Sequence, residues 1–247
     1  MKQFFKSLFS QPRTATLLLI SSLFITALAL VPAFYVILVL NKFLSSGVVS
    51  TLVTLTVGAV LSILFEYVFR QNRQQLLSTF LYKQSHKVLL AMKEKVQKEK
   101  QMPMEVSKSL QTIDMTNKSS VISGVLDAPF QLVFFVIIFS MSWQIGLLIV
   151  GFVLMALMLN QYRTVFNFKE YTTVHLDMAW TSLLTVCVIS FGAVLTLNGE
   201  LTVGSLIGLN ILSARTFMTM NKYFKVKPLI ERRYESLKQL ENYTNSI

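Results

Sequence analysis

Long apolar stretches separated by short polar breaks cover most of the chain. A membrane-spanning helix needs about 20 predominantly apolar residues. Residues 14–40 and 178–199 carry no charge, and residues 51–69 carry only Glu66. Residues 128–162 are also free of charge, which is long enough for two spans with a break near residues 140–146. With the apolar run that begins at Leu201, the pattern predicts six spans, at about residues 14–40, 51–69, 125–141, 144–161, 178–197 and 201–220.

Lysine and arginine fall almost entirely on one side of this layout. With six spans, the N-terminal tail, residues 70–127, residues 162–177 and the segment from Arg215 share one side, and they hold 22 of the 23 basic residues. Only Lys42 lies on the other side. Because basic residues accumulate in cytoplasmic loops, both termini are expected in the cytoplasm. The predicted fold class is an all-α membrane protein whose external connections are short: residues 41–50, 140–146 and 198–200.

The composition agrees with this class. Hydrophobic residues make up 53% of the 247 residues, and charged residues make up 14%, whereas soluble domains carry about 25% charged residues. The net charge of +11 is accounted for by the cytoplasmic loops and by attraction to anionic lipid, so the expected partner is the lipid bilayer and not nucleic acid. The single cysteine, Cys187, lies within a predicted span, so no disulfide framework is expected.

The two predicted cytoplasmic loops differ in length. Apolar residues recur at helical spacing through the first part of residues 70–127, which predicts that the second span continues as a helical rod. Two legs of about 25 residues would each reach about 37 Å. The tip of this rod, near residues 103–114, contains Pro103, Met104, Glu105, Ser107 and Asp114. The other loop, residues 162–177, would reach only about 12 Å.

No catalytic constellation stands out in the sequence. A phosphate-binding P-loop needs the dipeptide Gly-Lys, which does not occur in the chain. The two histidines, His86 and His175, lie in different loops without metal-ligand spacing. The chain is therefore expected to have no enzymatic activity and to bind no metal or cofactor of its own.

Four charged residues near the ends of predicted spans are candidate pathway or structural charges. They are Glu66, Arg70, Asp127 and Arg215. Ionisable residues at membrane depth commonly face a bundle interior or a watery cavity. Glu66 and Arg70 are four residues apart, which allows an ion pair on one helix face. The alternative for each of the four is that the side chain snorkels to the cytoplasmic interface.

Three segments carry a resemblance to a known family. "VPAFYVILVLNKFLSSGVVSTL" (31–52), "LDAPFQLVFF" (126–135) and "GELTVGSLIGLNILSAR" (199–215) resemble, in order, the first span with its external loop, the opening of the third span, and the turn from the fifth to the sixth span of ABC exporters of the type I secretion family. The resemblance implies a bundle of six spans, a dimer, and Arg215 facing the central path. It also implies that residues 103–114 form the coupling tip that engages an ATPase.

The chain departs from the family pattern at several points. The family's Val-Tyr-Asp-Arg-Val stands here as Val-Leu-Asn-Lys-Phe at residues 39–43, and its Ser-Gly-Arg stands as Ser-Ala-Arg at residues 213–215. The 247 residues contain no ATPase domain, and the second internal loop, residues 162–177, is a stub. The resemblance therefore implies the fold more directly than it implies autonomous transport.

Two functions follow as expectations. In the first, the chain is a permease-like subunit in a bacterial inner membrane that exports a protein or peptide. ATP would be hydrolysed by a partner, either an ABC half-transporter or a separate ATPase, and the chain would form a homodimer or a heterodimer. In the second, it is a non-transporting scaffold or regulatory subunit derived from such an exporter, in contact with other secretion components. The long first internal loop favours the first function, and the stub favours the second.

Overall fold

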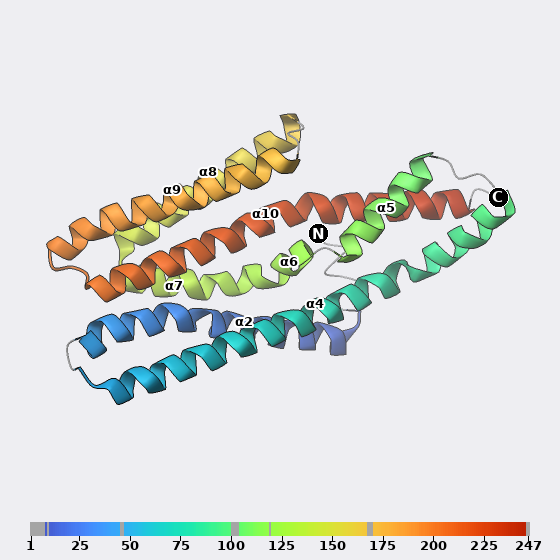
Figure 1. Ribbon diagram of the computed structural model, residues 1–247. Coiled ribbons are helices and arrows are strands. Elements are labelled where there is room, and N and C mark those ends of the chain that lie inside the picture. Colours follow the sequence, from blue (N-terminus) through green and yellow to red (C-terminus); the bar gives the residue numbers. More distant parts are fainter. Residues whose placement is uncertain are drawn as a thin grey trace.

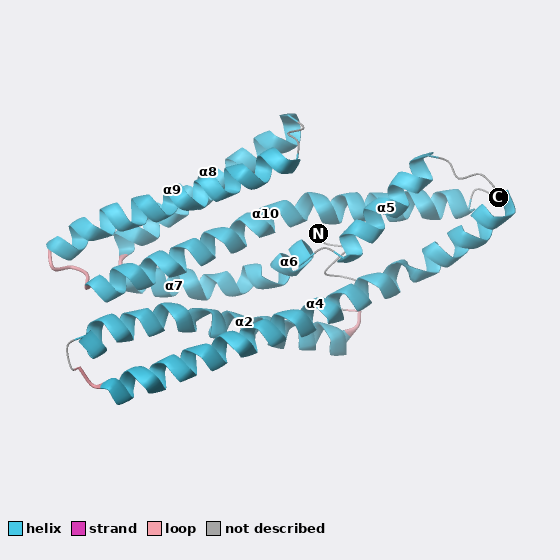
Figure 2. Ribbon diagram, in the orientation of Figure 1, coloured by secondary structure: helices cyan, strands magenta, loops and turns pink. Residues whose placement is uncertain are grey.

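The computed structural model describes residue 8 and residues 10–44, 47–99, 104–118, 120–166 and 170–245. Within these ranges every element is a helix, and loops are confined to the connections (Figure 2). The elements are α2 (Pro12–Leu38), the π-helical turn η1 (Val39–Phe43), α4 (Val49–Glu99), α5 (Met104–Lys118), the 3-10 turn η2 (Ser120–Ser123), α6 (Gly124–Asp127), the 3-10 turn η3 (Ala128–Phe130), α7 (Gln131–Met141), α8 (Trp143–Phe166), α9 (Glu170–Leu197) and α10 (Val203–Asn245).

Among the described residues, five helical segments are long and apolar enough to cross a membrane, which identifies the chain as a multi-pass membrane protein. They are Pro12–Phe43, Val49–His86, Gly124–Met141, Trp143–Gln161 and Leu176–Leu197. Each contains one of the first five predicted spans. The sixth prediction, residues 201–220, falls in the first half of α10, which does not meet the same criteria.

The helices form an elongated bundle with a narrower extension at one end (Figure 1). α2 and α4 lie side by side along one edge, α7 and the first half of α10 run through the middle, and α8 and α9 form a hairpin on the other edge. The first turns of α2 reach past the end of this hairpin, and among the described helices α4, α5 and α10 continue farthest beyond it. We call this extension, residues 74–99 of α4, all of α5 and residues 226–245 of α10, the stalk.

Two predicted loops are shorter than the sequence indicated. Residues 162–177 were expected to form a loop, but α8 continues to Phe166 and α9 begins at Glu170. In the first external connection, η1 extends the helix to Phe43 and α4 begins at Val49. Polar side chains end a span without ending its helix, because the backbone keeps its hydrogen bonds when the helix leaves the hydrocarbon.

The break between the third and fourth spans is a single residue. Ser142 has extended backbone angles, φ −158° and ψ 113°, between the end of α7 and the start of α8. Its side chain lies within hydrogen-bond distance, 3.0 Å, of Gln144 Oε1, and Gln144 Nε2 donates to Glu200 Oε2 at 2.9 Å. The connection between α7 and α8 is thereby tied to the turn between α9 and α10, so this end of the bundle is held together.

Apolar side chains form three buried clusters along the molecule. The first lies between α2, α7, α8, α9 and α10 and includes Ala33, Phe134, Ile149, Leu184 and Leu212. The second joins the stalk-side half of α2 to α4, α6 and α10, and the third joins α5 to the end of α10. α10 contributes to all three, so it is the central element of the fold.

Two glycines allow α10 to approach α2 closely. Gly204 and Gly208 are four residues apart and therefore lie on one face of α10, a spacing that permits close packing of membrane helices. A Cβ on Gly208 would lie 2.4 Å from Ile37 Cγ1 and 3.3 Å from the Ala33 carbonyl oxygen. The backbone oxygen leaves little room for Ile37 to move away.

We expect Gly208→Val to destabilise the protein by about 1–3 kcal/mol, because a side chain there would force α2 and α10 apart. The measurement is the thermal unfolding midpoint in detergent. The matched control is Gly58→Val on α4, where an added Cβ meets nothing within 4 Å. Equal midpoints for the two variants would contradict this account of the α2–α10 contact.

A buried ion-pair network and its cavity

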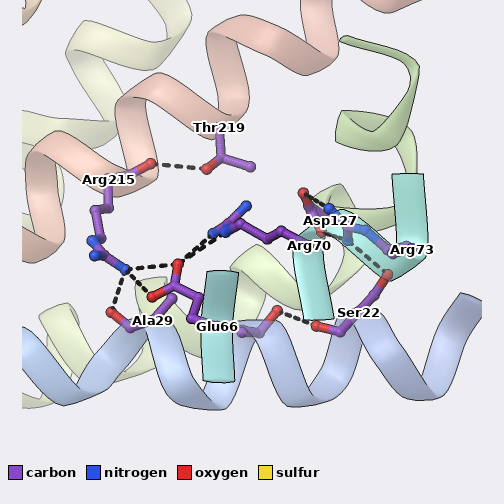
Figure 3. A network of polar contacts seen from close by, with 9 residues as sticks. Ser22, Ala29, Glu66, Arg70, Arg73, Asp127, Arg215 and Thr219 are labelled. Carbon is purple, nitrogen blue, oxygen red and sulfur yellow. Dashed lines mark hydrogen bonds and ion pairs between the residues drawn. The ribbon is translucent and has the colours of Figure 1, made fainter. Parts of the chain in front are cut away.

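One face of α4 carries three charged residues. Glu66, Arg70 and Arg73 are spaced by four and three residues, so their side chains leave the helix on the same side. This side meets α2, α6 and α10, and the three side chains join a network of polar contacts there (Figure 3). α4 thus supplies the charges and its neighbours supply their partners.

Glu66 is shared by two arginines. Arg70 donates from Nε and Nη2 to Glu66 Oε1, at 2.9 and 2.8 Å, which is the ion pair predicted from their spacing. Arg215 Nη1 donates to the Ala29 carbonyl oxygen at 2.8 Å and lies 3.4 Å from each oxygen of Glu66. Glu66 is 7% exposed, so its carboxylate is buried against both cations.

Arg73 and Asp127 form a second ion pair, which is buried between the helices. Both terminal nitrogens of Arg73 donate to the carboxylate of Asp127, one of them at 3.0 Å. Arg73 Nη1 also donates to Ser22 Oγ on α2 at 3.0 Å. Arg73 is 2% exposed and Asp127 is 8% exposed. The pair fastens α2, α4 and α6 at one point, and parallel bonds between a guanidinium and a carboxylate are among the stronger polar contacts in proteins.

The network lies near the stalk end of the spans. Counted along α4 from Val49 at 1.5 Å per residue, Glu66 lies at about 26 Å and Arg73 at about 36 Å. The hydrocarbon core of a bilayer is about 30 Å thick. Arg215 lies about 18 Å along α10 from Val203, so it is the most deeply placed of these charges.

A cavity of about 330 Å³ opens beside the two pairs. Its charged lining consists of Glu66, Arg70, Asp127, Arg215 and Lys222. The remaining lining residues are Ile25, Thr26, Ala29, Gln131, Phe134, Met218 and Thr219. Glu66, Arg70, Asp127 and Arg215 thus line one cavity. The side chains of Arg70 and Arg215 are also partly exposed, by 44% and 34%.

The chemistry of this cavity favours binding. Its polar lining combines the charged side chains with the hydroxyls of Thr26 and Thr219 and the amide of Gln131. Among the described residues, no group of three histidine, cysteine or acidic side chains is placed to hold a metal ion. What the cavity presents is a set of fixed cations beside one shared carboxylate.

The predicted coupling tip is only partly described. Pro103 and the side chain of Glu105 lie outside the described residues. Met104, Ser107 and Asp114 lie on α5, which packs on the end of α10 through Val106, Ile113 and Leu240. Ser109 Oγ also donates to Gln239 Oε1 at 2.9 Å. α5 therefore runs back along the stalk.

One buried arginine in the stalk was not predicted from the sequence. Arg233 is fully buried, and it donates to the Leu81 carbonyl oxygen at 2.8 Å, to Thr116 Oγ1 at 3.3 Å and to Asn117 Oδ1. It joins α10 to both α4 and α5. Burial lowers the pKa of Arg233 to about 10, because a charged guanidinium loses its hydration there.

Four further residues of the network and its cavity were not predicted from the sequence: Arg73, Ser22, Gln131 and Lys222. One signal was available for Arg73, since it extends the face formed by Glu66 and Arg70 by one further turn. The others become visible only when the helices pack.

No protein-family model and no curated protein matches this chain. The ion-pair network, its cavity and the stalk therefore carry the functional inference.

Proposed function

We propose that the chain is the membrane subunit of an ABC-exporter-like transporter that moves a protein or peptide across a bacterial inner membrane, with ATP hydrolysed by a partner. The observation that carries this proposal is the stalk, which places a helix with an unused face far from the spans. α4 is 51 residues long, so it extends about 45 Å past a 30 Å hydrocarbon core.

The two faces of α5 differ in what they contact. Its inner face, with Val106, Ser109, Ile113 and Thr116, is buried. Its outer face carries Met104 and Met115, which are 72% and 63% exposed. These methionines are eleven residues apart, so they lie on one side of the helix. Methionine is common at protein-binding surfaces because its side chain adapts to the partner. A partner motor would contact this outer face.

We also propose that the chain crosses the membrane six times and that both termini lie in the cytoplasm. α10 follows α9 after a short turn and packs against α2, α7, α8 and α9. Its first half is therefore at the depth of the other spans. Leu209, Leu212, Ser213 and Thr216 are buried there, so neighbouring helices shield its polar residues from lipid. A shielded helix crosses a membrane with less hydropathy than a lipid-facing one.

The test uses cross-linking from the tip in a Cys187→Ser background. A cysteine at Ser107, which is exposed on α5, should cross-link in cells to a protein that carries a P-loop. Met115→Glu should reduce that product about tenfold, because it places a charge in the proposed contact. The control is Leu90→Glu, which makes the same kind of change at an exposed position on α4.

The same background reports orientation. A cysteine at Ser107 should react with a membrane-impermeant reagent only after the membrane is opened, and a cysteine at the exposed Asn198 should react from outside. Labelling of Ser107 in intact cells would overturn the proposed orientation. A cross-linked partner without a nucleotide site would overturn the borrowed motor.

A scaffold or regulatory subunit is the second candidate, and the α8–α9 hairpin favours it. Only residues 167–169 separate the two helices as described, and the hairpin ends well short of the tip of α4 (Figure 1). An ATPase docked at the tip would touch this chain through one internal loop instead of two. If no ATPase cross-links to Ser107→Cys and Met115→Glu leaves secretion unchanged, the scaffold is the better description.

A further inference from the structure

The cavity beside the ion pairs has an excess of positive charge. Asp127 is already matched by Arg73, which is buried behind it. Of the remaining charges in the lining, Arg70, Arg215 and Lys222 stand against Glu66 alone. Three cations around one carboxylate repel one another at a site that is partly shielded from water. An anion in the cavity would relieve this repulsion.

The cavity also contains a buried acceptor without a donor. Gln131 is 5% exposed, and its side-chain oxygen has no hydrogen-bond partner. Leaving a buried polar atom unpaired costs about 1–3 kcal/mol. Because Gln131 lines the same cavity as the three cations, a ligand with both a negative charge and a hydroxyl group would satisfy both requirements.

The position of the cavity fits a lipid headgroup. Lys222 lies about 29 Å along α10 from Val203, and Arg70 lies about 32 Å along α4 from Val49. Both are exposed, and both stand near the limit of a hydrocarbon core of about 30 Å, where lipid phosphates begin. Ile25, Phe134 and Met218 supply an apolar wall. A volume of about 330 Å³ is at the lower end of ligand pockets, which suits a headgroup.

We propose that this cavity binds a hydroxyl-bearing phosphate ester, with its phosphate between Arg70, Arg215 and Lys222 and its hydroxyl donating to Gln131. The source is the headgroup of an anionic phospholipid in the leaflet on the stalk side. Basic pockets between membrane helices bind such headgroups. Bound there, the lipid joins α4, α7 and α10. The proposal does not depend on the motor, because it concerns a site within the spans.

The test compares three lipids on the full chain purified in detergent, with binding followed by native mass spectrometry and by the thermal midpoint. Phosphatidylglycerol carries one negative charge and free hydroxyls, phosphatidylmethanol carries the charge alone, and phosphatidylcholine is zwitterionic. We expect phosphatidylglycerol to bind most tightly and to raise the midpoint, since a ligand that binds only the folded state stabilises it. Phosphatidylcholine should have little effect.

Two variants assign the contacts. Lys222→Gln should weaken phosphatidylglycerol binding about fivefold, since one cation near a lipid phosphate contributes about 1 kcal/mol. Gln131→Leu should remove the preference for phosphatidylglycerol over phosphatidylmethanol. Arg232→Gln, at an exposed position in the stalk, should leave binding unchanged. Lys222→Gln and Arg232→Gln with equal affinities would overturn the site, as would equal binding of phosphatidylcholine.

The remaining outcomes also decide between the parts of the proposal. Equal binding of phosphatidylglycerol and phosphatidylmethanol by the unaltered chain would overturn the role of the hydroxyl and of Gln131. Soluble glycerol phosphate is the probe for the other source. If it competes at equal concentration, the cavity binds the proposed chemistry from solution, and the lipid source is overturned. If it does not compete, the lipid source is supported.

Discussion

Replacing Asp127 with alanine should destabilise the folded protein by about 3–5 kcal/mol. The reason is that Arg73, which is 2% exposed, would keep its charge and lose both bonds to the carboxylate. The measurement is the free energy of unfolding in mixed detergent, with Glu231→Gln as a control. Glu231 is exposed on α10, so its change should stay within about 0.5 kcal/mol.

The double variant Arg73→Met with Asp127→Leu keeps two buried side chains at this contact but removes both charges. Apolar side chains of similar volume often replace a buried ion pair at little cost. We therefore expect the double variant to recover most of the stability lost in Asp127→Ala. If Asp127→Ala unfolds no more easily than Glu231→Gln, or if the double variant is the least stable of the three, the pair does not hold the helices as described.

The second large effect is expected at Arg233. Its replacement by alanine should destabilise the stalk by about 3–5 kcal/mol, because it opens a cavity, removes the bond to the Leu81 carbonyl and takes the guanidinium donor from Asn117 Oδ1. Hydrogen exchange at α5 is the appropriate measurement, since the stalk can open while the spans stay folded. The neighbouring Arg232 is exposed, so Arg232→Ala should leave exchange nearly unchanged. Similar exchange in both variants would contradict the proposed role.

The lowered pKa of Arg233 determines whether the free energy of unfolding rises or falls with pH. Near pH 10 the folded chain releases a proton from Arg233 that the unfolded chain keeps to a higher pH. The contribution of this residue to stability therefore rises with pH in that window, and below pH 9 it is constant. The rise should be absent in Arg233→Met, when the unfolding free energies of the two proteins are compared at pH 9 and pH 11.

Sequence patterns found the features that depend on one helix at a time. Five of the predicted spans follow from hydropathy, and the Glu66–Arg70 pair follows from its four-residue spacing. The Arg73–Asp127 pair joins residues 54 positions apart. No local pattern brings them together, because their contact depends on how α2, α4 and α6 pack. Arg233 is hidden in the same way by the packing of α5.

α10 explains why hydropathy alone is an incomplete guide. Hydropathy estimates how favourable it is to place a helix in the membrane when its whole surface contacts lipid. In the first half of α10, Ser213 and Thr216 are buried against protein, and their hydroxyls bond to the carbonyls of Leu209 and Leu212. Polar residues buried in this way lower the mean hydropathy of a helix, although they do not face lipid.

The contact between α5 and the end of α10 sets an order of events during synthesis. Val106 and Ile113 lie in one buried cluster with Leu240, about 130 residues later in the chain. At 5–20 residues per second, the ribosome takes about 6–26 s to cover that distance. During this interval the apolar face of α5 lacks the partner that α10 supplies and is available to chaperones and proteases. A nascent chain that stalls within α10 would therefore present a degradation signal made from the same residues that close the finished stalk.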